Sequence, residues 1–265
     1  MHKSICSDRA MKRRPARNAR RLAYGKCMAD KPTTLTASEA ERYYNRFGKK
    51  QDSQGFYEDP ALNDVIIHAG FQGADRIFEF GCGTGKFASR LLRDHLPASA
   101  TYLGCDVSSV MVGLATQRLN KYSERAKVIQ TDGTVYFPVS DHSTDRVISS
   151  YVLDLLSDKD IRTFFTEAHR VLIPGGRVCL ASLTKGNTLL SRIVSSLWMA
   201  VFRIRPSIVG GCRPIILDEY VDRDRWKLEH RKILTPFGVP SEALVLIPKD
   251  LSNKANSADT RSSLA

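Results

Sequence analysis

The sequence predicts a doubly wound α/β fold whose seven-stranded sheet is mostly parallel and ends in an antiparallel hairpin. The main observation is alternation, because between residues 76 and 183 short apolar runs typical of strands are separated by segments with apolar residues at helical spacing. A second observation is that the last two strand-like runs, 225–234 and 242–249, are parted only by the turn TPFGVPS. A turn this short leaves no room for a crossover helix, so we expect these two runs to pair as antiparallel neighbours.

The other elements follow in order along the chain. A helix is predicted over 36–47, where Thr36 and Glu39 form a capping-box pattern, and a second helix over 60–71. Ser157 and Asp160 form the same pattern at the start of a later helix. Five strand-like runs occupy residues 76–80, 101–106, 126–132, 145–150 and 176–183, and helical patterns occupy 85–96, 108–119 and 157–172.

The charge of the chain is concentrated at its amino terminus. Residues 1–27 hold nine basic residues against Asp8 alone, a net +8 out of +12, which leaves +4 for the rest of the chain. We therefore expect a basic, disordered leader over 1–32, a folded domain over 33–249, and a disordered polar tail over 250–265. Three interpretations of the leader stay open: an organellar transit segment, an arm for nucleic acid or acidic surfaces, or a solvated segment without a role.

Composition narrows the class of protein. With 265 residues, 42% of them hydrophobic, the chain can bury a sizeable core. No apolar run approaches the ~20 residues needed to span a bilayer, so we expect a cytoplasmic protein, with contact to a membrane surface left open. The six cysteines show no spacing suited to zinc, and no metal is expected. Cys82, Cys105 and Cys179 are expected to be small core residues in a reducing compartment.

The stretch RIFEFGCGTGKFASRLL, residues 76–92, places three glycines between a strand and a helix. A phosphate-binding P-loop needs a glycine at Phe80 and a Ser or Thr at Phe87, which excludes that motif. A dinucleotide fingerprint needs its third glycine where Lys86 stands. The GxGxG spacing still makes a tight turn, and the backbone amides at the start of the helix suit an anion that need not be a phosphate.

Here the chain resembles the class I S-adenosylmethionine-dependent methyltransferases over roughly residues 60–183. EFGCGTG is similar to their first motif, and Asp106, which closes TYLGCD, stands where the family keeps an acid. QTDG supplies Asp132 and Gly133, and EAHRVLIPGGRVCLASL is similar to the family's helix, Pro-Gly-Gly turn and fifth strand. These landmarks lie in order at successive strand ends. The resemblance implies the Rossmann-like fold of that family and S-adenosylmethionine as the cofactor.

The resemblance also implies which residues hold this cofactor. The turn amides suit its carboxylate, Glu79 its ammonium, Asp106 its two ribose hydroxyls and Asp132 its adenine amine. The implied cofactor-binding residues are Glu79, Gly81, Gly83, Gly85, Asp106, Val107, Met111, Asp132, Gly133, Ser150 and Tyr151. Each landmark has a purely structural alternative, in which the glycines only permit a turn, Asp106 caps the next helix and Asp132 begins a turn with Gly133.

The methyl acceptor is less constrained by the sequence. The stretch SSYVLDLLS, residues 149–157, lies where the family borders the acceptor, and it lacks the Asn-Pro-Pro-Tyr type of motif found in enzymes that methylate amino groups of nucleic acids and proteins. Asp154 is the candidate catalytic base, with capping or pairing on the next helix as the alternative. His68 and His142 are expected on a helix surface and in a loop rather than in catalysis.

Segments outside the shared core resemble, more loosely, the ubiquinone and menaquinone biosynthesis methyltransferases and related small-molecule enzymes. In YYNRFGKKQDSQGFYEDPAL, the aromatic residues Tyr43, Tyr44 and Phe47 fit a lid over the cofactor or, alternatively, a helix packed on the sheet. We therefore predict methyl transfer to a small, apolar or aromatic molecule. An RNA methyltransferase guided by residues 1–27, a non-catalytic cofactor-binding protein and, less favoured, a dehydrogenase are the alternatives.

The long connection after the fifth strand predicts one more helix. The folded domain divides into a cofactor-binding core (60–183), an acceptor-side insertion (184–224) and the terminal hairpin (225–249). In the insertion one stripe at helical spacing comprises Leu189, Leu190, Ile193, Val194, Leu197, Trp198, Val201 and Phe202, with Arg192, Ser195, Ser196 and Arg203 largely opposite. We expect this stripe either to cover the sheet or to roof an apolar acceptor pocket.

Overall fold

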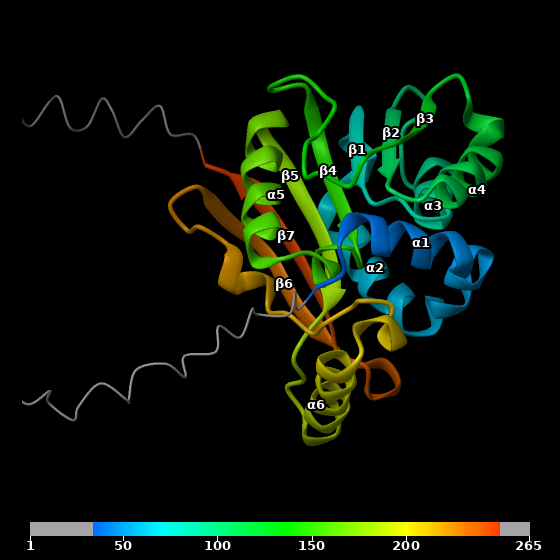
Figure 1. Cartoon of the computed structure of the whole chain (residues 1–265). Helices are drawn as coiled ribbons and strands as arrows, with labels where there is room; N and C mark the ends of the chain where they lie inside the picture. Colours follow the sequence, from blue (N-terminus) through cyan, green and yellow to red (C-terminus); the bar gives the residue numbers. More distant parts are fainter. Residues whose placement is uncertain (1–33, 250–265) are drawn as a thin grey trace, which may run out of the picture. The chain divides into compact units, whose positions relative to one another are not determined.

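Seven strands form one sheet in the computed structural model, which describes residues 34–249 (Figure 1). The predicted leader and tail, with Cys6 and Cys27, lie outside the described residues. The strand order is β3-β2-β1-β4-β5-β7-β6, and every pairing is parallel except those of β7 with β5 and β6. The strands are β1 (Arg76–Phe80), β2 (Thr101–Asp106), β3 (Ala126–Gln130), β4 (Thr144–Ser150), β5 (Leu172–Leu183), β6 (Trp226–Leu234) and β7 (Ser241–Pro248). The predicted doubly wound sheet and its final hairpin are confirmed.

Helices cover both faces of the sheet. α2 (Gly55–Ala69) and α3 (Lys86–Asp94) pack on one face, and α5 (Asp158–Val171) packs on the other. Side chains alternate along each strand, so Ile77 of β1 enters the first core and Phe78 enters the second. The chain order reverses between β1 and β4, and in such sheets ligands bind at the carboxyl ends of the strands at this switch point.

Both predicted helix caps are present, whereas one helix starts earlier than predicted. α1 (Ala37–Phe47) has Thr36 as its N-cap with the Glu39 carboxylate accepting from the Thr36 amide at 2.9 Å, and Ser157 caps α5. α2 begins at Gly55 rather than at 60, because the 3₁₀ helix η1 (Gly48–Gln54) runs directly into it and Pro60 is tolerated inside. The other helical elements are α4 (Ser109–Leu119), α6 (Leu189–Ile204), η2 (Phe71–Gly73), η3 (Asn120–Tyr122), η4 (Leu153–Leu155), η5 (Pro206–Val209), η6 (Leu217–Tyr220) and η7 (Pro236–Gly238).

The orientation of α6 differs from the prediction. Ser191, Ser195 and Phe202 face the protein. The predicted inward stripe is instead largely in solvent, with Leu189, Leu190, Ile193 and Leu197 between 50% and 78% exposed. The prediction that these four residues cover the sheet or roof a pocket is therefore wrong.

Small and polar side chains explain this orientation. Thr188 and Ser191 form a capping box at the start of the helix. The Gly186 amide donates to Ser195 Oγ at 3.4 Å. A methyl group at Gly186 would lie 2.2 Å from the Ser191 backbone. These residues let the start of α6 approach the chain that leads to it. Trp198 keeps its inward position, because its Nε1 donates to the Cys212 carbonyl at 2.9 Å. Within residues 34–249 no helix is both long enough and apolar enough to cross a membrane.

Candidate active site

The glycine turn between β1 and α3 is built for close backbone packing. Gly81, Gly83 and Gly85 all have positive φ, at 75°, 53° and 70°. A methyl group at Gly81 would lie 2.3 Å from Val152 Cγ2, and one at Gly85 would lie 3.0 Å from Ala115 Cβ. A methyl group at Gly83 would meet no atom within 4 Å. Two glycines are thus needed for packing, and the middle one leaves the backbone open to a ligand.

Asp106 closes β2 beside this turn. Its two carboxylate oxygens accept from the amides of Gly83 and Ser108, each at 2.9 Å. Burial raises the pKa of Asp106, and the backbone amides of Ser108, Gly83 and Val107 oppose that rise. The cap of α4 is Ser108, whose Oγ accepts from the Met111 amide, so the capping alternative for Asp106 is not realised. Each oxygen keeps a second lone pair for a hydroxyl donor.

Glu79 lies at the carboxyl end of β1 and joins three strands. Its carboxylate accepts from the Tyr102 hydroxyl of β2 at 2.6 Å and from Ser150 Oγ of β4 at 3.5 Å. The residue is 1% exposed, and burial raises its pKa to about 7. A cation next to Glu79 would favour its charged form, as a bound ammonium does.

Asp132 and Gly133 follow β3 on the exposed side of the same edge. Asp132 Oδ1 accepts from the amide and the hydroxyl of Thr134, at 2.9 and 2.6 Å, which lowers its pKa. Asp132 thus begins a turn with Gly133, as the purely structural interpretation predicted. Its other carboxylate oxygen, Oδ2, faces solvent. Gly133 has φ 83°, and Ala37 Cβ lies 2.5 Å from where its methyl group would stand. α1 therefore begins directly over this turn.

The two apolar residues assigned to the adenine ring follow β2. Met111 is 1% exposed in the first turn of α4, and Val107 is half-buried. Tyr151, by contrast, points into the core between α2 and β7. Its hydroxyl donates to Ser241 Oγ at 2.9 Å, and its ring packs edge-on against Tyr57 at 5.7 Å. Tyr151 also has φ 55°, a strained value for a bulky residue, directly after β4.

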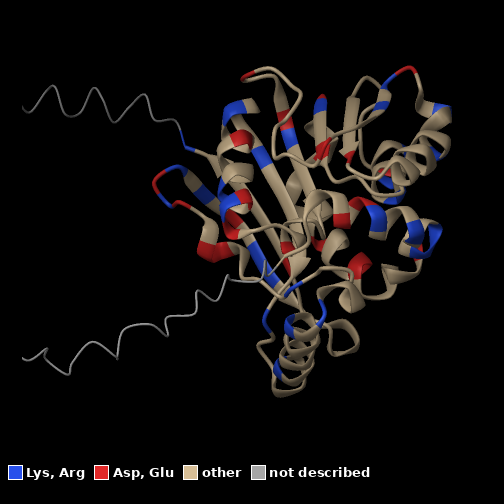
Figure 2. Ribbon diagram, viewed as in Figure 1, with Lys and Arg blue, Asp and Glu red and all other residues tan. Residues whose placement is uncertain are grey.

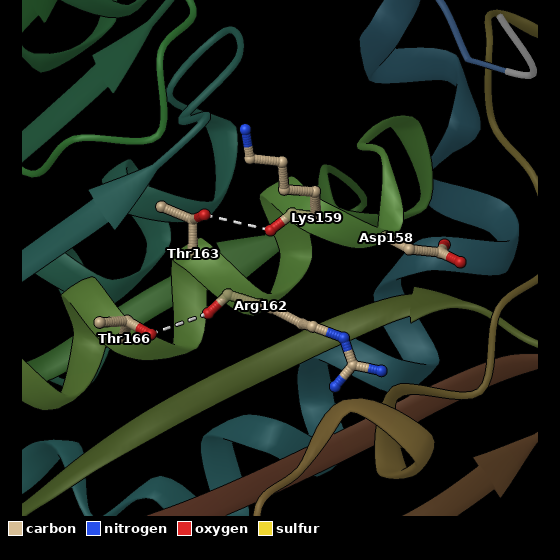
Figure 3. A pocket seen from close by; sticks show the side chains of 5 residues that line it. All are labelled: Asp158, Lys159, Arg162, Thr163 and Thr166. Atoms are coloured by element: carbon tan, nitrogen blue, oxygen red, sulfur yellow. Dashed lines mark hydrogen bonds between the residues drawn. The ribbon is translucent and has the colours of Figure 1, made fainter.

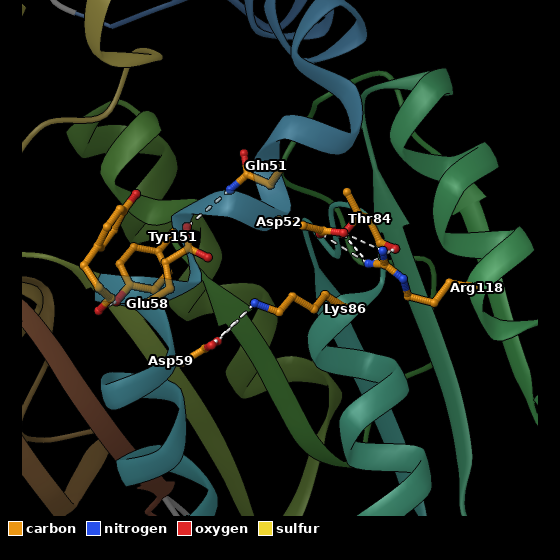
Figure 4. A network of polar contacts seen from close by, with 9 residues as sticks. Gln51, Asp52, Glu58, Asp59, Thr84, Lys86, Arg118 and Tyr151 are labelled. Carbon is orange, nitrogen blue, oxygen red and sulfur yellow. Dashed lines mark hydrogen bonds and ion pairs between the residues drawn. The ribbon is translucent and has the colours of Figure 1, made fainter.

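A polar latch ties the N-terminal segment to the glycine turn (Figure 4). Asp52 of η1 accepts from Thr84 Oγ1 at 2.6 Å and pairs with Arg118 at 2.5 Å, and Arg118 also donates to the Thr84 carbonyl at 3.0 Å. Beside it, Lys86 pairs with Asp59 at 3.4 Å. No sequence pattern indicates this latch, because Asp52 and Arg118 lie 66 residues apart and neither stands in a recognisable motif.

α1 forms a cover over the carboxyl edge, as one interpretation of its aromatic residues expected. Asn45 Oδ1 accepts from Ser108 Oγ at 2.7 Å and from the Val110 amide at 3.3 Å, which fixes α1 on α4. Tyr44 donates its hydroxyl to the Gly210 carbonyl at 3.4 Å. Gly210 lies against the ring of Tyr43, so the glycine pair in VGGCRP lets this segment approach the cover closely.

Asp154 is buried beneath that cover, in η4. Its Oδ2 accepts from the Leu183 amide at 3.2 Å, and its Oδ1 is buried without a hydrogen-bond partner among the described residues. Burial raises the pKa of Asp154 to about 7. Ser157, not Asp154, caps the following helix. The alternative prediction that Asp154 caps this helix is therefore wrong. Its Oδ1 atom remains able to accept a hydrogen bond.

Other acidic groups share this buried region with Asp154. Burial raises the pKa of Glu58 to about 8 and the pKa values of Tyr44, Tyr57 and Cys212 above their usual range, and the Asp154 charge raises each of them further. Perturbed groups of this kind gather at functional sites. Cys212 and Glu58 were missed in the sequence because only the folded chain brings α2, η4 and the segment after α6 together.

Two other features of the described residues, a surface depression on α5 and a cluster of one aspartate and two histidines, give weaker support for a ligand site. The depression in Figure 3 is lined only by the α5 residues Asp158, Lys159, Arg162, Thr163 and Thr166, and both threonine hydroxyls donate to carbonyls of the helix itself. Elsewhere, Asp64, His68 and His230 offer three ligand atoms within 4.8 Å of one another. Lys232 Nζ lies 3.2 Å from Asp64, and the two imidazole rings are stacked at 3.4 Å. The ammonium already neutralises the carboxylate, so we assign no metal there.

Known proteins share this fold and sequence pattern. Residues 77–176 match the family model described as a methyltransferase domain. The chain is 27% identical over 192 residues to a malonyl-[acyl-carrier protein] O-methyltransferase of Hahella chejuensis, covering 67% of this chain and 65% of that protein. It is 27% identical over 135 residues to the tRNA N(3)-methylcytidine methyltransferase Mettl2 of Drosophila melanogaster, covering 50% and 41%. The crystal structure of geranyl diphosphate C-methyltransferase from Streptomyces coelicolor superposes with a TM-score of 0.59 at 13% identity, over 83% of this chain and 98% of that chain.

The fold is that of the class I methyltransferases. Residues 77–176 therefore carry the sequence pattern of a methyltransferase domain, and the chain is similar to the class I S-adenosylmethionine-dependent methyltransferases, for which S-adenosylmethionine is the cofactor. The chain spans about half the length of the curated relatives it matches. Because those relatives are named for unlike acceptors, they do not define the acceptor of this chain.

The residues at the carboxyl edge fit this cofactor. The open backbone at Gly83 and the amides of the turn suit a carboxylate, and Glu79 carries the negative charge that an ammonium needs. Asp106 has two free lone pairs next to that turn. The carboxylate oxygen of Asp132 that faces solvent can accept from an amine. These assignments are the expected ones, and their test is binding of the cofactor to variants of each residue.

Proposed function

We propose that the protein transfers the methyl group of S-adenosylmethionine to a small, apolar or aromatic acceptor held under α1. The observation that carries this proposal is Asp154, which is completely buried with one unpartnered carboxylate oxygen beneath the cover. A group with an unfilled acceptor in a dry, tyrosine-rich region suits a small molecule that brings one polar hydrogen.

The cofactor, when bound, supplies an electrophilic methyl group. Alignment supplies most of the acceleration in such a displacement, so the chain's main task is to hold the acceptor in line and to exclude water. Tyr44 of α1 encloses the acceptor from above, and Cys212, in the segment after α6, encloses it from the side. The Cys212 Sγ lies 4.0 Å from the Tyr44 hydroxyl. Asp154 Oδ1 accepts the polar hydrogen of the acceptor and removes it as the methyl group arrives. Its pKa of about 7 suits a general base at neutral pH.

The test uses the full chain with methyl-labelled S-adenosylmethionine and two acceptor pools, a whole-cell small-molecule extract and total RNA. Label in a small molecule, identified by mass spectrometry, supports the proposal. The Asp154→Asn variant, which keeps an acceptor for the Leu183 amide, is expected to slow transfer by ~10² or more with cofactor affinity within about twofold of the unchanged protein. Equal turnover in this variant would remove Asp154 from the chemistry.

A second candidate, an RNA methyltransferase, has one structural observation in its favour. Arg42, Arg46, Lys49 and Lys50 are exposed along α1 and η1, next to the carboxyl edge (Figure 2). The tRNA methyltransferase relative and the basic residues 1–27 point the same way. This candidate predicts label in RNA rather than in the extract, and salt-sensitive RNA binding that weakens in Arg42→Glu/Arg46→Glu.

A further inference from the structure

α6 presents an apolar face to solvent on the side opposite its buried face. At about 100° per residue, Leu190, Ile193 and Leu197 project away from the side that carries Ser191, Ser195 and Phe202. A helix that packs by one face on its own protein normally shows a polar face outside. Here Leu189, Leu190, Ile193, Leu197 and Ile204 are all at least half exposed.

The apolar surface continues beyond α6 onto the neighbouring turn. In Figure 1 the turn that contains η7 lies beside α6, and a methyl group at Gly238 would lie 3.4 Å from Leu190. Phe237, 82% exposed with φ 51°, packs edge-on against the exposed Phe56 at 5.8 Å. We call this surface the apolar face; it comprises Phe56, Leu189, Leu190, Ile193, Leu197, Ile204 and Phe237. Exposed apolar side chains gathered in this way mark an interaction site.

The segment that carries α6 has charges of one sign only. Residues 184–217 contain five basic residues and no acidic one. Arg213 pairs with Asp158 at 2.8 Å, whereas Lys185, Arg192, Arg203 and Arg205 are exposed and pair with no acid within residues 34–249. On the helix, Arg192 and Arg203 lie close together along one edge of the exposed apolar residues. Figure 2 shows these basic residues around α6, without an acidic one on the helix.

We propose that the apolar face docks on an anionic lipid surface, with α6 lying in the interface. An amphipathic helix whose apolar side chains are flanked by Lys and Arg has the composition that binds there, because the apolar groups enter the acyl boundary and the cations meet the headgroups. A second copy of the chain would bring two basic surfaces together. The chain's own residues 1–27 are basic as well, so they do not complement this face.

The position of the face connects docking with the candidate active site. α6 follows β5 at the carboxyl edge, and Trp198 of α6 holds the Cys212 carbonyl at the wall of the acceptor region. A docked α6 would therefore bring that wall next to the lipid. This connection rests on the proposed function, and it suits an apolar acceptor drawn from the membrane. The docking itself does not depend on methyl transfer.

The test measures flotation of the full chain with vesicles of phosphatidylcholine alone and vesicles with about one third phosphatidylglycerol. Binding is expected to be at least about tenfold stronger to the anionic vesicles. Ile193→Asp/Leu197→Asp should lower that binding at least about tenfold. The matched control Ile67→Asp changes an apolar residue that is 73% exposed on α2, outside the apolar face, and should change binding less than about twofold. Thermal unfolding of each variant confirms that it is folded.

Three outcomes would overturn the docking proposal, and a fourth would separate it from the proposed function. Unchanged vesicle binding in Ile193→Asp/Leu197→Asp would show that residues 1–27 alone attract lipid. No vesicle binding, or equal binding to neutral and anionic vesicles, would remove the anionic surface as the partner. A dimer in light scattering that is lost in the double variant, without lipid binding, would make the face a self-association surface. Docking with no labelled small molecule in the transfer assay would retain the lipid contact and reject the proposed function.

Discussion

Replacing Asp154 by Asn should stabilise the protein, and the gain should grow with pH. The folded state holds the pKa of Asp154 at about 7, against 3.8 for an unperturbed aspartate. Below pH 3.8 the carboxyl is protonated in both the folded and the unfolded chain, so its titration does not lower the free energy of unfolding. As the pH rises from there to 7 the unfolded chain releases its proton while the folded chain keeps it, so the folded state loses stability. Above 7 the full difference applies, about 4 kcal/mol at 1.36 kcal/mol per pH unit.

Asn removes this titration and introduces a buried amide, whose cost of about 1 to 3 kcal/mol does not depend on pH. The difference in unfolding free energy between the variant and the unchanged protein should therefore rise by about 3 kcal/mol between about pH 5 and pH 8. Urea unfolding at several pH values measures it. Asp158→Asn is the control, because Tyr220 and Arg213 lower the pKa of that exposed carboxyl and its loss should cost a little stability at neutral pH. Parallel curves for Asp154→Asn and the unchanged protein would refute the raised pKa.

Three other variants probe the glycine turn and its surroundings. Asp106→Ala should weaken S-adenosylmethionine binding by ~1 to 3 kcal/mol in calorimetry, and an unchanged affinity would remove Asp106 from the cofactor site. Gly85→Ala should lower the unfolding free energy by ~1 to 3 kcal/mol, because φ is 70° and Ala115 is in the way, whereas Gly113→Ala, with no atom within 4 Å, should raise it by ~0.5 to 1 kcal/mol. Asp52→Ala should speed cofactor release in stopped flow by ~10-fold, as should Arg118→Ala, with no further gain in the double variant if both act through one latch.

The sequence predicted what is local and missed what depends on distant contacts. The carboxyl ends of β1, β2, β4 and β5, the Thr36 cap and the final hairpin follow from neighbouring residues, and all are present. The Asp52–Arg118 pair could not be predicted, because each residue is an ordinary surface charge until η1 folds over α4. The stripe on α6 was recognised correctly as apolar, but periodicity reports only that one face is apolar. Whether protein or solvent meets that face depends on Ser191 and Ser195, which approach the preceding loop more closely than leucine could.

A final prediction concerns Glu79 and the pH dependence of cofactor binding. Affinity should rise with pH, whereas the titration of Asp154 lowers stability as the pH rises. Its surroundings are the Tyr102 hydroxyl, Ser150 Oγ and the Asp106 carboxylate, and burial holds its pKa at about 7. An ammonium is held by the carboxylate, not by the protonated acid, so binding of S-adenosylmethionine should release this proton. Affinity should then tighten about fivefold from about pH 6 to pH 7, where the ionised fraction of Glu79 rises by that factor, and change little beyond about pH 8.

Calorimetry in buffers of different ionisation enthalpy measures the released proton directly. Glu79→Gln should bind more weakly and lose the pH dependence between about pH 6 and 7, while Asp132→Ala, which alters an exposed carboxylate whose pKa is lowered, should keep it. A proton taken up on binding, or a pH dependence that survives in Glu79→Gln, would mean that the ammonium is held elsewhere. Glu79 would then be left with its bonds to Tyr102 and Ser150 alone, and its role would be to join β1, β2 and β4 at the switch point.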